Sequence, residues 1–250
     1  MAVYTTIDNP ELYFQTKIYT GDGNDNRAIT FDGSENMQPN LTWFKSRSAA
    51  TWHNVYDSVR GANKSLATNA TNAEESRSDT MDSFDSNGFT LGNDTSQSPN
   101  GLNTNASGYT YVAWCWKETA DAGFDIVSYT GDGSASTTIS HSLSAVPHWI
   151  IVKNRSEATS WCVAHKSLST DKVLRLEGTN AEGDIGDGEL DSPPASSSNF
   201  AFNNGTSGTP LKVVNESSDS YIAYLWSEKQ GFSKFGSYAT NNNADGPYIF

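Results

Sequence analysis

Cysteine is nearly absent from this sequence. Only Cys115 and Cys162 occur in 250 residues, and they are far apart in the chain. Metal-binding and redox cysteines usually occur as close-spaced pairs, so the sequence argues against both kinds of site. We expect both thiols to be small buried hydrophobic side chains.

Basic residues are scarce as well. The chain has 16 Lys and Arg against 29 Asp and Glu, which gives a net charge of −13. Sequence-independent binding of nucleic acid depends on Lys and Arg that neutralise phosphates, so we expect no nucleic-acid partner. The acidic balance is expected to keep the surface soluble, with high-salt surroundings or adhesion through cations as alternatives.

Long apolar runs are the third absence. No run of about 18 apolar residues occurs, so we expect no membrane insertion. The chain opens at Met1 without a basic segment or an apolar stretch of signal-peptide length, so secretion by the general route is not expected.

Small polar and aromatic residues are what the chain has instead. Only 18% of residues are charged, and the aromatic set comprises seven Trp, eleven Tyr and eleven Phe. Runs of Asn, Ser, Thr and Gly favour turns, and aromatic residues suit pleated, half-buried surfaces. This composition predicts an all-β protein.

Internal repetition predicts how the chain is divided. The sequence Tyr-Thr-Gly-Asp-Gly at 19–23 recurs unchanged at 129–133, and Tyr111 to Glu118 matches Tyr221 to Glu228. The segments between them correspond at similar shifts, which indicates one fold occurring twice. We therefore predict an N-terminal arm or attachment segment at 1–14, β-sandwich repeats of about 110 residues at 15–121 and 122–230, and a last segment at 231–250.

The last segment has two interpretations. Phe232 to Tyr238 follows the pattern of Phe124 to Tyr129, so 231–250 is either the start of a truncated third repeat or an edge-strand segment. An edge strand of this kind completes a sheet of the preceding unit or of a neighbouring subunit.

Short alternating segments within the second unit predict its strands. Eight of them, separated by Gly, Asn, Asp and Ser clusters, lie at 125–130, 137–141, 148–154, 161–165, 172–177, 199–202, 211–214 and 221–227. Strands at this spacing indicate antiparallel, jelly-roll-like sandwiches. In the first unit we predict a loop at 72–85.

Candidate catalytic and metal-binding residues are few. One Gly-rich loop gathers Asp184, Asp187, Glu189 and Asp191, but their spacing does not fit an EF-hand and the first unit has no matching cluster. We predict a solvated loop, with Ca²⁺ binding at acidic loops as the minor alternative. No pair of acids stands out for glycan cleavage, which needs two carboxylates across a groove.

The histidines also lack the spacing of a metal site, and we predict structural roles for His53, His141, His148 and His165. The sequence thus predicts no catalytic, cofactor-binding or metal residue.

Two recurring features have both a structural and a binding interpretation. The Gly-Asp-Gly turns at 21–23 and 131–133 are predicted to be hairpin turns, with cation or sugar binding as the alternative. The tryptophans recur on strands, so we predict core packing for most of them in preference to glycan stacking. Trp114 and Trp116 share one strand face, and at least one face of that strand is predicted to be buried by aromatic residues.

Several motifs together resemble a repeat found in structural proteins of marine tailed bacteriophages, especially cyanophages. They are the Tyr-Thr-Gly-Asp-Gly motif, Ser86 to Gly92, Tyr111 to Lys117 and Gly231 to Tyr238, and the resemblance extends from Thr6 to Phe250. It carries no catalytic residues.

The resemblance implies a non-enzymatic virion protein assembled in the host cytoplasm, namely a tail fibre or appendage involved in host attachment. Its partners are expected to be other virion proteins and a host cell-surface glycan or receptor, contacted through loops such as 93–107 and 182–198. A homo-oligomer, trimeric by analogy, is expected. The alternatives are a capsid decoration or head-fibre protein and, less favoured, a glycan-cleaving fibre enzyme.

Overall fold

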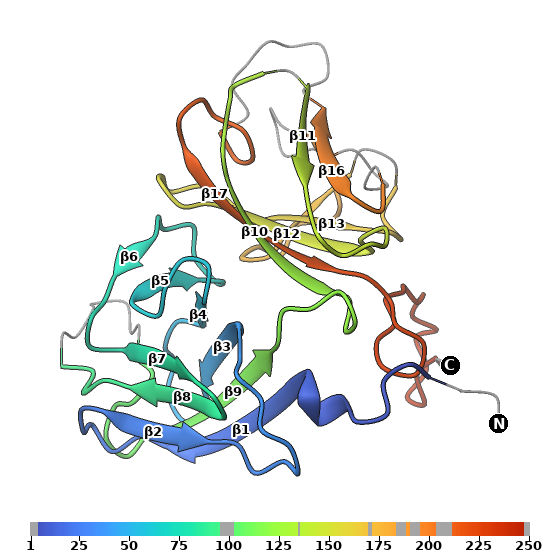
Figure 1. The fold of residues 1–250 in the computed structure, drawn as a ribbon. Coiled ribbons are helices and arrows are strands. Elements are labelled where there is room, and N and C mark those ends of the chain that lie inside the picture. The colour runs from blue at the N-terminus through green and yellow to red at the C-terminus, as the bar shows by residue number, and fades with distance from the viewer. Residues whose placement is uncertain are drawn as a thin grey trace.

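The computed structural model describes residues 5–95, 103–134, 136–169, 172–183, 189–190, 196–203 and 212–247. These residues form antiparallel sheets in two bodies (Figure 1). The single helical element among them is a 3-10 turn, η1 (Pro10–Leu12), whose N-cap Asn9 accepts a hydrogen bond from the Glu11 amide. The predicted all-β class is confirmed.

The first body contains a main sheet of six strands and a smaller sheet of three. The main sheet has the order β1 (Phe14–Thr20), β9 (Thr110–Trp116), β3 (Leu41–Ser46), β4 (Asn54–Asp57), β5 (Lys64–Ala67) and β6 (Glu75–Ser76). The smaller sheet has the order β2 (Arg27–Thr30), β8 (Gly88–Leu91) and β7 (Met81–Asp85).

The second body has sheets of five and three strands. Its main sheet has the order β10 (Phe124–Thr130), β17 (Ser220–Trp226), β12 (Trp149–Asn154), β13 (Cys162–His165) and β14 (Leu174–Arg175). The smaller sheet has the order β11 (Ser136–Ser140), β16 (Asn199–Asn203) and β15 (Glu189–Leu190).

Corresponding residues take corresponding places in the two main sheets. Tyr19 lies opposite Tyr111 in the first, and Tyr129 lies opposite Tyr221 in the second. The rings of both pairs are stacked, with centroids 5.3 Å and 5.0 Å apart. The same local pattern of aromatic and small residues thus gives the same strand register in both bodies.

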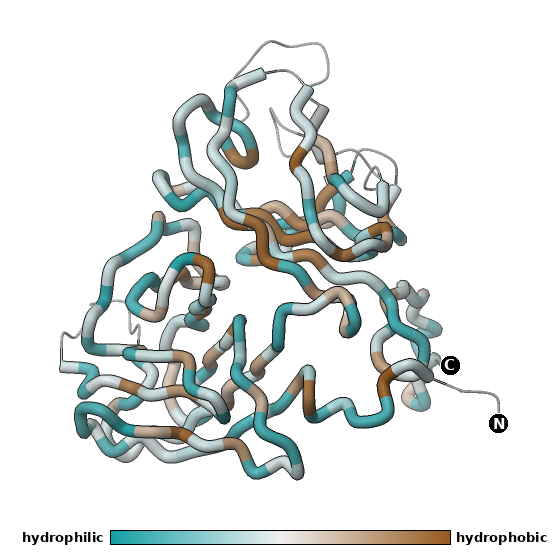
Figure 2. Tube along the Cα trace, viewed as in Figure 1, coloured by the Kyte–Doolittle hydropathy of each residue, from teal (hydrophilic) through white to brown (hydrophobic). Residues whose placement is uncertain are grey.

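Each body has its own apolar core. In the first it includes Phe44, Phe89 and Tyr111, and in the second Val152, Phe200 and Leu225. Figure 2 shows hydrophobic stretches along the central strands of the second body and hydrophilic residues along many of the loops. Cys115 and Cys162 are fully buried free thiols, as predicted, and burial raises the pKa of each.

Three predicted elements of the secondary structure were wrong. Residues 212–214, in the segment predicted as a strand at 211–214, form a turn, and the predicted strand at 172–177 is reduced to Leu174–Arg175. The predicted loop at 72–85 contains β6 and β7, whose Met81 is fully buried in the core. A register shift between Met81 and Ser83 interrupts the alternation of β7, so that Phe84, three positions after Met81, also packs against the core.

The Gly-Asp-Gly turns are not hairpins. Gly21 to Gly23 connect β1 to β2, which belong to different sheets, and Gly131 to Gly133 connect β10 to β11 in the same way. A Cβ on Gly21 would lie 2.2 Å from the carbonyl oxygen of Ala106, and one on Gly131 would lie 2.1 Å from that of Glu216. Glycine is required here because another loop packs directly against the turn.

The last described segment folds back onto the molecule. Within 231–247 the only strand-like pairing is the bridge between Lys229 and Ser233. Phe232 packs edge to face on Tyr13 at 6.2 Å, and Phe235 packs on Trp149 at 5.9 Å. Within the described residues, this segment therefore does not add a strand to the preceding unit.

Candidate functional site

The two bodies meet through a shared apolar core. From the first main sheet Leu41, Val55 and Leu66 contribute, and from the second Ile151, Val163 and Trp226. Register places Leu41 opposite Trp116 on β9, just as Trp149 lies opposite Trp226 on β17. Corresponding faces of the two main sheets therefore pack against each other.

Trp161 is the side chain that joins the bodies most closely. It is fully buried, although it belongs to the second body. Its indole Nε1 donates hydrogen bonds to the carbonyl oxygens of Ala67 and Ala70 in the first body, at 2.9 Å and 3.1 Å. Burying a large aromatic side chain with its N–H satisfied stabilises the junction by roughly 3 kcal/mol.

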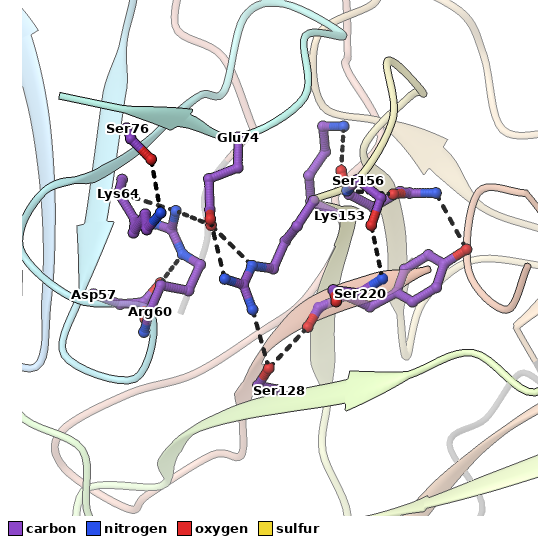
Figure 3. A network of polar contacts seen from close by, with 12 residues as sticks. Asp57, Arg60, Lys64, Glu74, Ser76, Ser128, Lys153, Ser156 and Ser220 are labelled. Atoms are coloured by element: carbon purple, nitrogen blue, oxygen red, sulfur yellow. Dashed lines mark hydrogen bonds and ion pairs between the residues drawn. The ribbon is translucent and has the colours of Figure 1, made fainter. Parts of the chain in front are cut away.

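Charged residues cross the same junction. Arg155 of the second body donates from Nε and Nη2 to the two carboxylate oxygens of Glu74 in the first, at 2.8 Å and 3.0 Å (Figure 3). Glu74 also accepts from Arg60, which pairs with Asp57. Tyr224 of the second body completes the group by donating to Asp57 at 2.7 Å.

The four charges balance one another. Burial acts to raise the pKa of Glu74, but the hydrogen bonds from Arg155 and Arg60 outweigh it, so the pKa is lowered overall. Burial likewise acts to lower the pKa of Arg60, and the facing Asp57 carboxylate reverses this and raises it. A buried group of this kind contributes mainly a defined geometry, because the cost of desolvation offsets much of its attraction.

An aromatic pocket lies at one end of this junction. It has a volume of about 270 Å³ and is lined by eight aromatic side chains together with Lys117, Ala122 and Ser233. Trp226 forms its centre, stacked on Trp149 at 4.6 Å and on Phe124 at 4.9 Å. This cavity combines an open apolar surface with a nearby charge, so we take it as the candidate binding site.

Segments distant in the sequence assemble the pocket. The Lys117 amide donates to the Tyr13 carbonyl at 2.9 Å, which joins the end of β9 to the start of β1. The Phe235 amide donates to the carboxylate of Glu228 at 2.9 Å, and Gly231 turns the chain with a φ of +78°. The aromatic lining therefore depends on tertiary contacts among the N-terminal segment, the linker between β9 and β10 (residues 117–123) and the last segment.

The Gly-Asp-Gly turns are tied to a buried asparagine in each body. The Asp22 amide donates to the Asn105 side-chain oxygen, and the Asp132 amide donates to that of Asn215, both at 3.1 Å. Asp132 accepts from Ser134, Thr137 and Asn215, and these bonds hold its pKa below the usual range. The oxygens of Asp132 are thus used within the fold.

His148 and His165 are neighbours, because the Lys166 amide donates to the His148 carbonyl at 2.9 Å, whereas His53 and His141 lie apart from them. Nδ1 of His148 accepts from the Glu228 amide at 3.0 Å, and Nδ1 of His165 accepts from Ser167 at 3.1 Å. His141 Nδ1 accepts from Leu143 at 3.3 Å, while His53 is half-buried on the first body. Across the described ranges, no three His, Cys, Asp or Glu side chains are grouped to hold a metal ion.

The acidic loop is largely outside the described residues, since Asp184, Asp187 and Asp191 belong to the undescribed part and only the backbone of Glu189 is described, in β15. The predicted Ca²⁺ alternative at that loop therefore stays a prediction. The predicted contact loops at 93–107 and 182–198 are described only in part.

A pair of acids that the sequence did not single out lies where the two bodies are joined, with Glu118 after β9 and Asp125 in β10. Burial, then a hydrogen bond to Asp125, raises the pKa of Glu118 to about 7. The Ile126 amide donates to Glu118 at 3.2 Å and to Asp125 at 3.1 Å. The signal was present, because Glu118 and Glu228 end the two matching segments. Neither Glu118 nor Asp125 lines the aromatic pocket.

Two of the seven tryptophans, Trp161 and Trp226, are buried, in agreement with core packing. The other five are half-buried, and Trp116 and Trp149 line the pocket together with Trp226. On β9 the fully buried face carries Tyr111, Ala113 and Cys115. The half-buried Trp114 and Trp116 lie on the opposite face of the same strand.

No helix in the described part of the chain is long and apolar enough to cross a membrane. Compared with models of protein families, residues 9–250 match a family described as a domain of unknown function. No curated protein and no solved structure matches the chain.

Proposed function

The chain belongs to this family, DUF7483, and we propose that it is a non-enzymatic structural protein of a tailed-phage virion, a tail fibre or appendage involved in host-surface attachment. We further propose that its two bodies are tandem jelly-roll-like β-sandwich repeats. The resemblance of its sequence motifs to those of phage structural proteins supports the first statement. The matching strand orders and tyrosine pairs support the second.

The observation that carries the proposal is the packed and hydrogen-bonded junction between the two bodies. Trp161 anchors one body in the other, and Arg155 and Glu74 fix their orientation. A mechanical component that transmits or resists force needs folded units held in a fixed relation, which a loose linker would not provide. An enzyme with a mobile lid would instead need a weakly held element beside its site.

Partners follow from this function. We propose other virion proteins as permanent partners and a host cell-surface glycan or receptor as the external one, reached through polar loops. A homo-oligomer is the expected assembly. We propose no catalytic residue and no cofactor. The carboxyl pair of Glu118 and Asp125 accepts from the Ile126 amide of β10, which gives it a structural task.

The test is binding of the purified, labelled chain to intact candidate host cells, with and without calcium, together with antibody localisation on virus particles. Saturable binding that differs between host strains, with label on tail appendages, supports the proposal. Antibody label on the capsid, without binding of the chain to cells, would indicate a capsid decoration protein and not an attachment protein. No label on particles would overturn the virion function altogether.

A further inference from the structure

The aromatic pocket has the size and chemistry for a single ring system. Its volume of about 270 Å³ lies just below the range of roughly 300 to 1,000 Å³ that is usual for small-molecule sites. Apart from Lys117, Ser233, the Tyr13 hydroxyl and the tryptophan N–H groups, its lining consists of hydrocarbon and aromatic ring surface. The Ser233 hydroxyl is already engaged, because it accepts from the Lys229 amide at 3.1 Å and donates to the Ser227 carbonyl at 3.4 Å.

This lining disfavours a sugar. A pyranose ring carries several hydroxyl groups that would lose water on entering, and buried hydroxyls without partners are costly. An aromatic side chain has no such requirement and gains from edge and face contacts with the rings already present. Trp149 and Phe235, with ring centroids 5.9 Å apart, provide tilted surfaces of this kind.

Lys117 gives the pocket a charge preference. Its side chain is exposed at the pocket, and it follows directly on Trp116, which forms part of the lining. Among the residues that the structure describes, Lys117 is the one charged residue of the pocket lining. In a chain with a net charge of −13, an exposed lysine at an apolar opening favours an occupant with acidic flanks.

The pocket also continues an interface that is already formed. Phe124 and Trp226 belong to the core shared by the two bodies, and they are among the rings that line the pocket. A ring entering there would extend the same stack that holds the bodies together. Binding at this position would therefore stabilise the junction and, through linkage, the folded chain.

We propose that the pocket receives one aromatic side chain from an acidic segment of a partner protein. This inference rests on the proposed function, since it names the kind of partner that the virion component binds. The ring occupies the space beside Trp149 and Phe235, and the acidic flanks face Lys117. The partner is thus recognised by a short linear motif, and the glycan receptor of the proposed function binds elsewhere.

The experiment uses the full chain and three synthetic peptides, acetyl-Asp-Phe-Asp-amide, acetyl-Asp-Ala-Asp-amide and acetyl-Lys-Phe-Lys-amide. Binding is followed by the chain's tryptophan emission, which none of the peptides contributes to. The acidic Phe peptide should saturate the signal, and the Ala peptide should not. The basic Phe peptide should bind roughly fivefold more weakly, as expected for an exposed charge pair.

Two variants and one matched control locate the site. Phe235→Ala should weaken binding of the acidic Phe peptide at least tenfold, and Lys117→Glu should reverse the preference between the charged Phe peptides. Tyr238→Ala serves as the control, because Tyr238 is a 63% exposed aromatic residue that is not among the pocket-lining residues. Circular dichroism checks that each variant is folded.

Equal binding of the two Phe peptides, or an unchanged preference in Lys117→Glu, would overturn the inference. So would binding that appears only after removal of 248–250, because the occupant would then be the chain's own end. If the chain is found on virus particles but does not bind the acidic Phe peptide, only this inference is overturned. If the chain is absent from virus particles, the proposed function is overturned, whether or not the peptides bind.

Discussion

Arg155 and Glu74 are 81 positions apart in the sequence and meet through two parallel hydrogen bonds across the junction of the two bodies. The Glu74 amide also donates to the Arg155 carbonyl at 3.0 Å. Side chain and backbone therefore connect the same two residues, which ties the end of β12 to the segment before β6.

Glu74→Gln should destabilise the chain more than Arg155→Met. The first change leaves Arg60 and Arg155 without their shared carboxylate, which costs about 3 kcal/mol in buried pairs. The second leaves Glu74 paired with Arg60, so we expect about 1 kcal/mol. Chemical unfolding followed by tryptophan fluorescence measures both. Lys212→Met breaks the exposed pair with Glu157 and is the control, with an expected loss below about 1 kcal/mol. Equal losses for all three changes would contradict the special role of Glu74.

Trp161→Phe should loosen the junction. The change removes the N–H that donates to Ala67 and Ala70 and leaves the buried Ala67 carbonyl with only the 3.3 Å bond from the Ala70 amide, at a cost of about 2 kcal/mol. Because the loss falls between the bodies, limited proteolysis should cut the linker near residues 119–123 faster than in the native chain. Unchanged cleavage of a stably folded variant would show that the indole is not what holds the bodies together.

Gly21→Ala should be strongly destabilising. Its new Cβ would lie 2.2 Å from the Ala106 carbonyl oxygen, and relieving that clash requires movement of backbone, with a typical cost of about 2 to 3 kcal/mol. Gly236→Ala is the matched control, because nothing lies within 4 Å of its Cβ position. A thermal melt that places both variants within a degree of the native chain would refute the close contact.

Glu118 should make stability depend on pH. Its pKa is raised from 4.5 to about 7 in the folded chain, so the folded state holds the proton more tightly than the unfolded state. Its contribution is therefore present below pH 4.5 and is lost as the pH rises towards 7.

Glu118→Gln should remove this part of the pH profile. The histidines shift stability in the opposite sense over part of the same range, since burial lowers the pKa of His141, His148 and His165. The measured quantity is thus the difference between native and variant melting temperatures at pH 5 and pH 8. A difference that does not change with pH would show that Glu118 does not titrate as stated.

Local patterns predicted the parts of the fold that depend on local physics. The strands β10 and β17 were placed within one residue, β17 as a run of apolar residues that is buried almost throughout, and both buried cysteines were expected. The strand β7 was missed because its exposed residues are polar and its core contact is Met81 alone among fully buried residues. The turn at 21–23 carries a hairpin signal, but the partner that decides its role, Asn105, is far away in the sequence.

The candidate site was beyond local patterns for a related reason. Tyr13, Trp116 and Phe235 meet only after three distant segments have packed together. A partial signal was available, because Gly-Phe occurs at 123–124 and again at 231–232 after matching Trp-containing strands. The ion pair of Arg155 and Glu74 was not predicted, because the repeat aligns Arg155 with Arg47 and Glu74 with Glu182 and so does not indicate that Arg155 of one unit meets Glu74 of the other.

If further bodies of this kind were added to form a filament, the packing of corresponding faces would determine its axial repeat. Val55 and Val163 occupy matching positions, and each is buried against the other body, so neither body keeps that face open for a further neighbour. Growth along one axis would have to alternate between this contact and a different one. The axial period would then be two sandwiches and not one, and diffraction or averaged images of such a filament should show the doubled spacing.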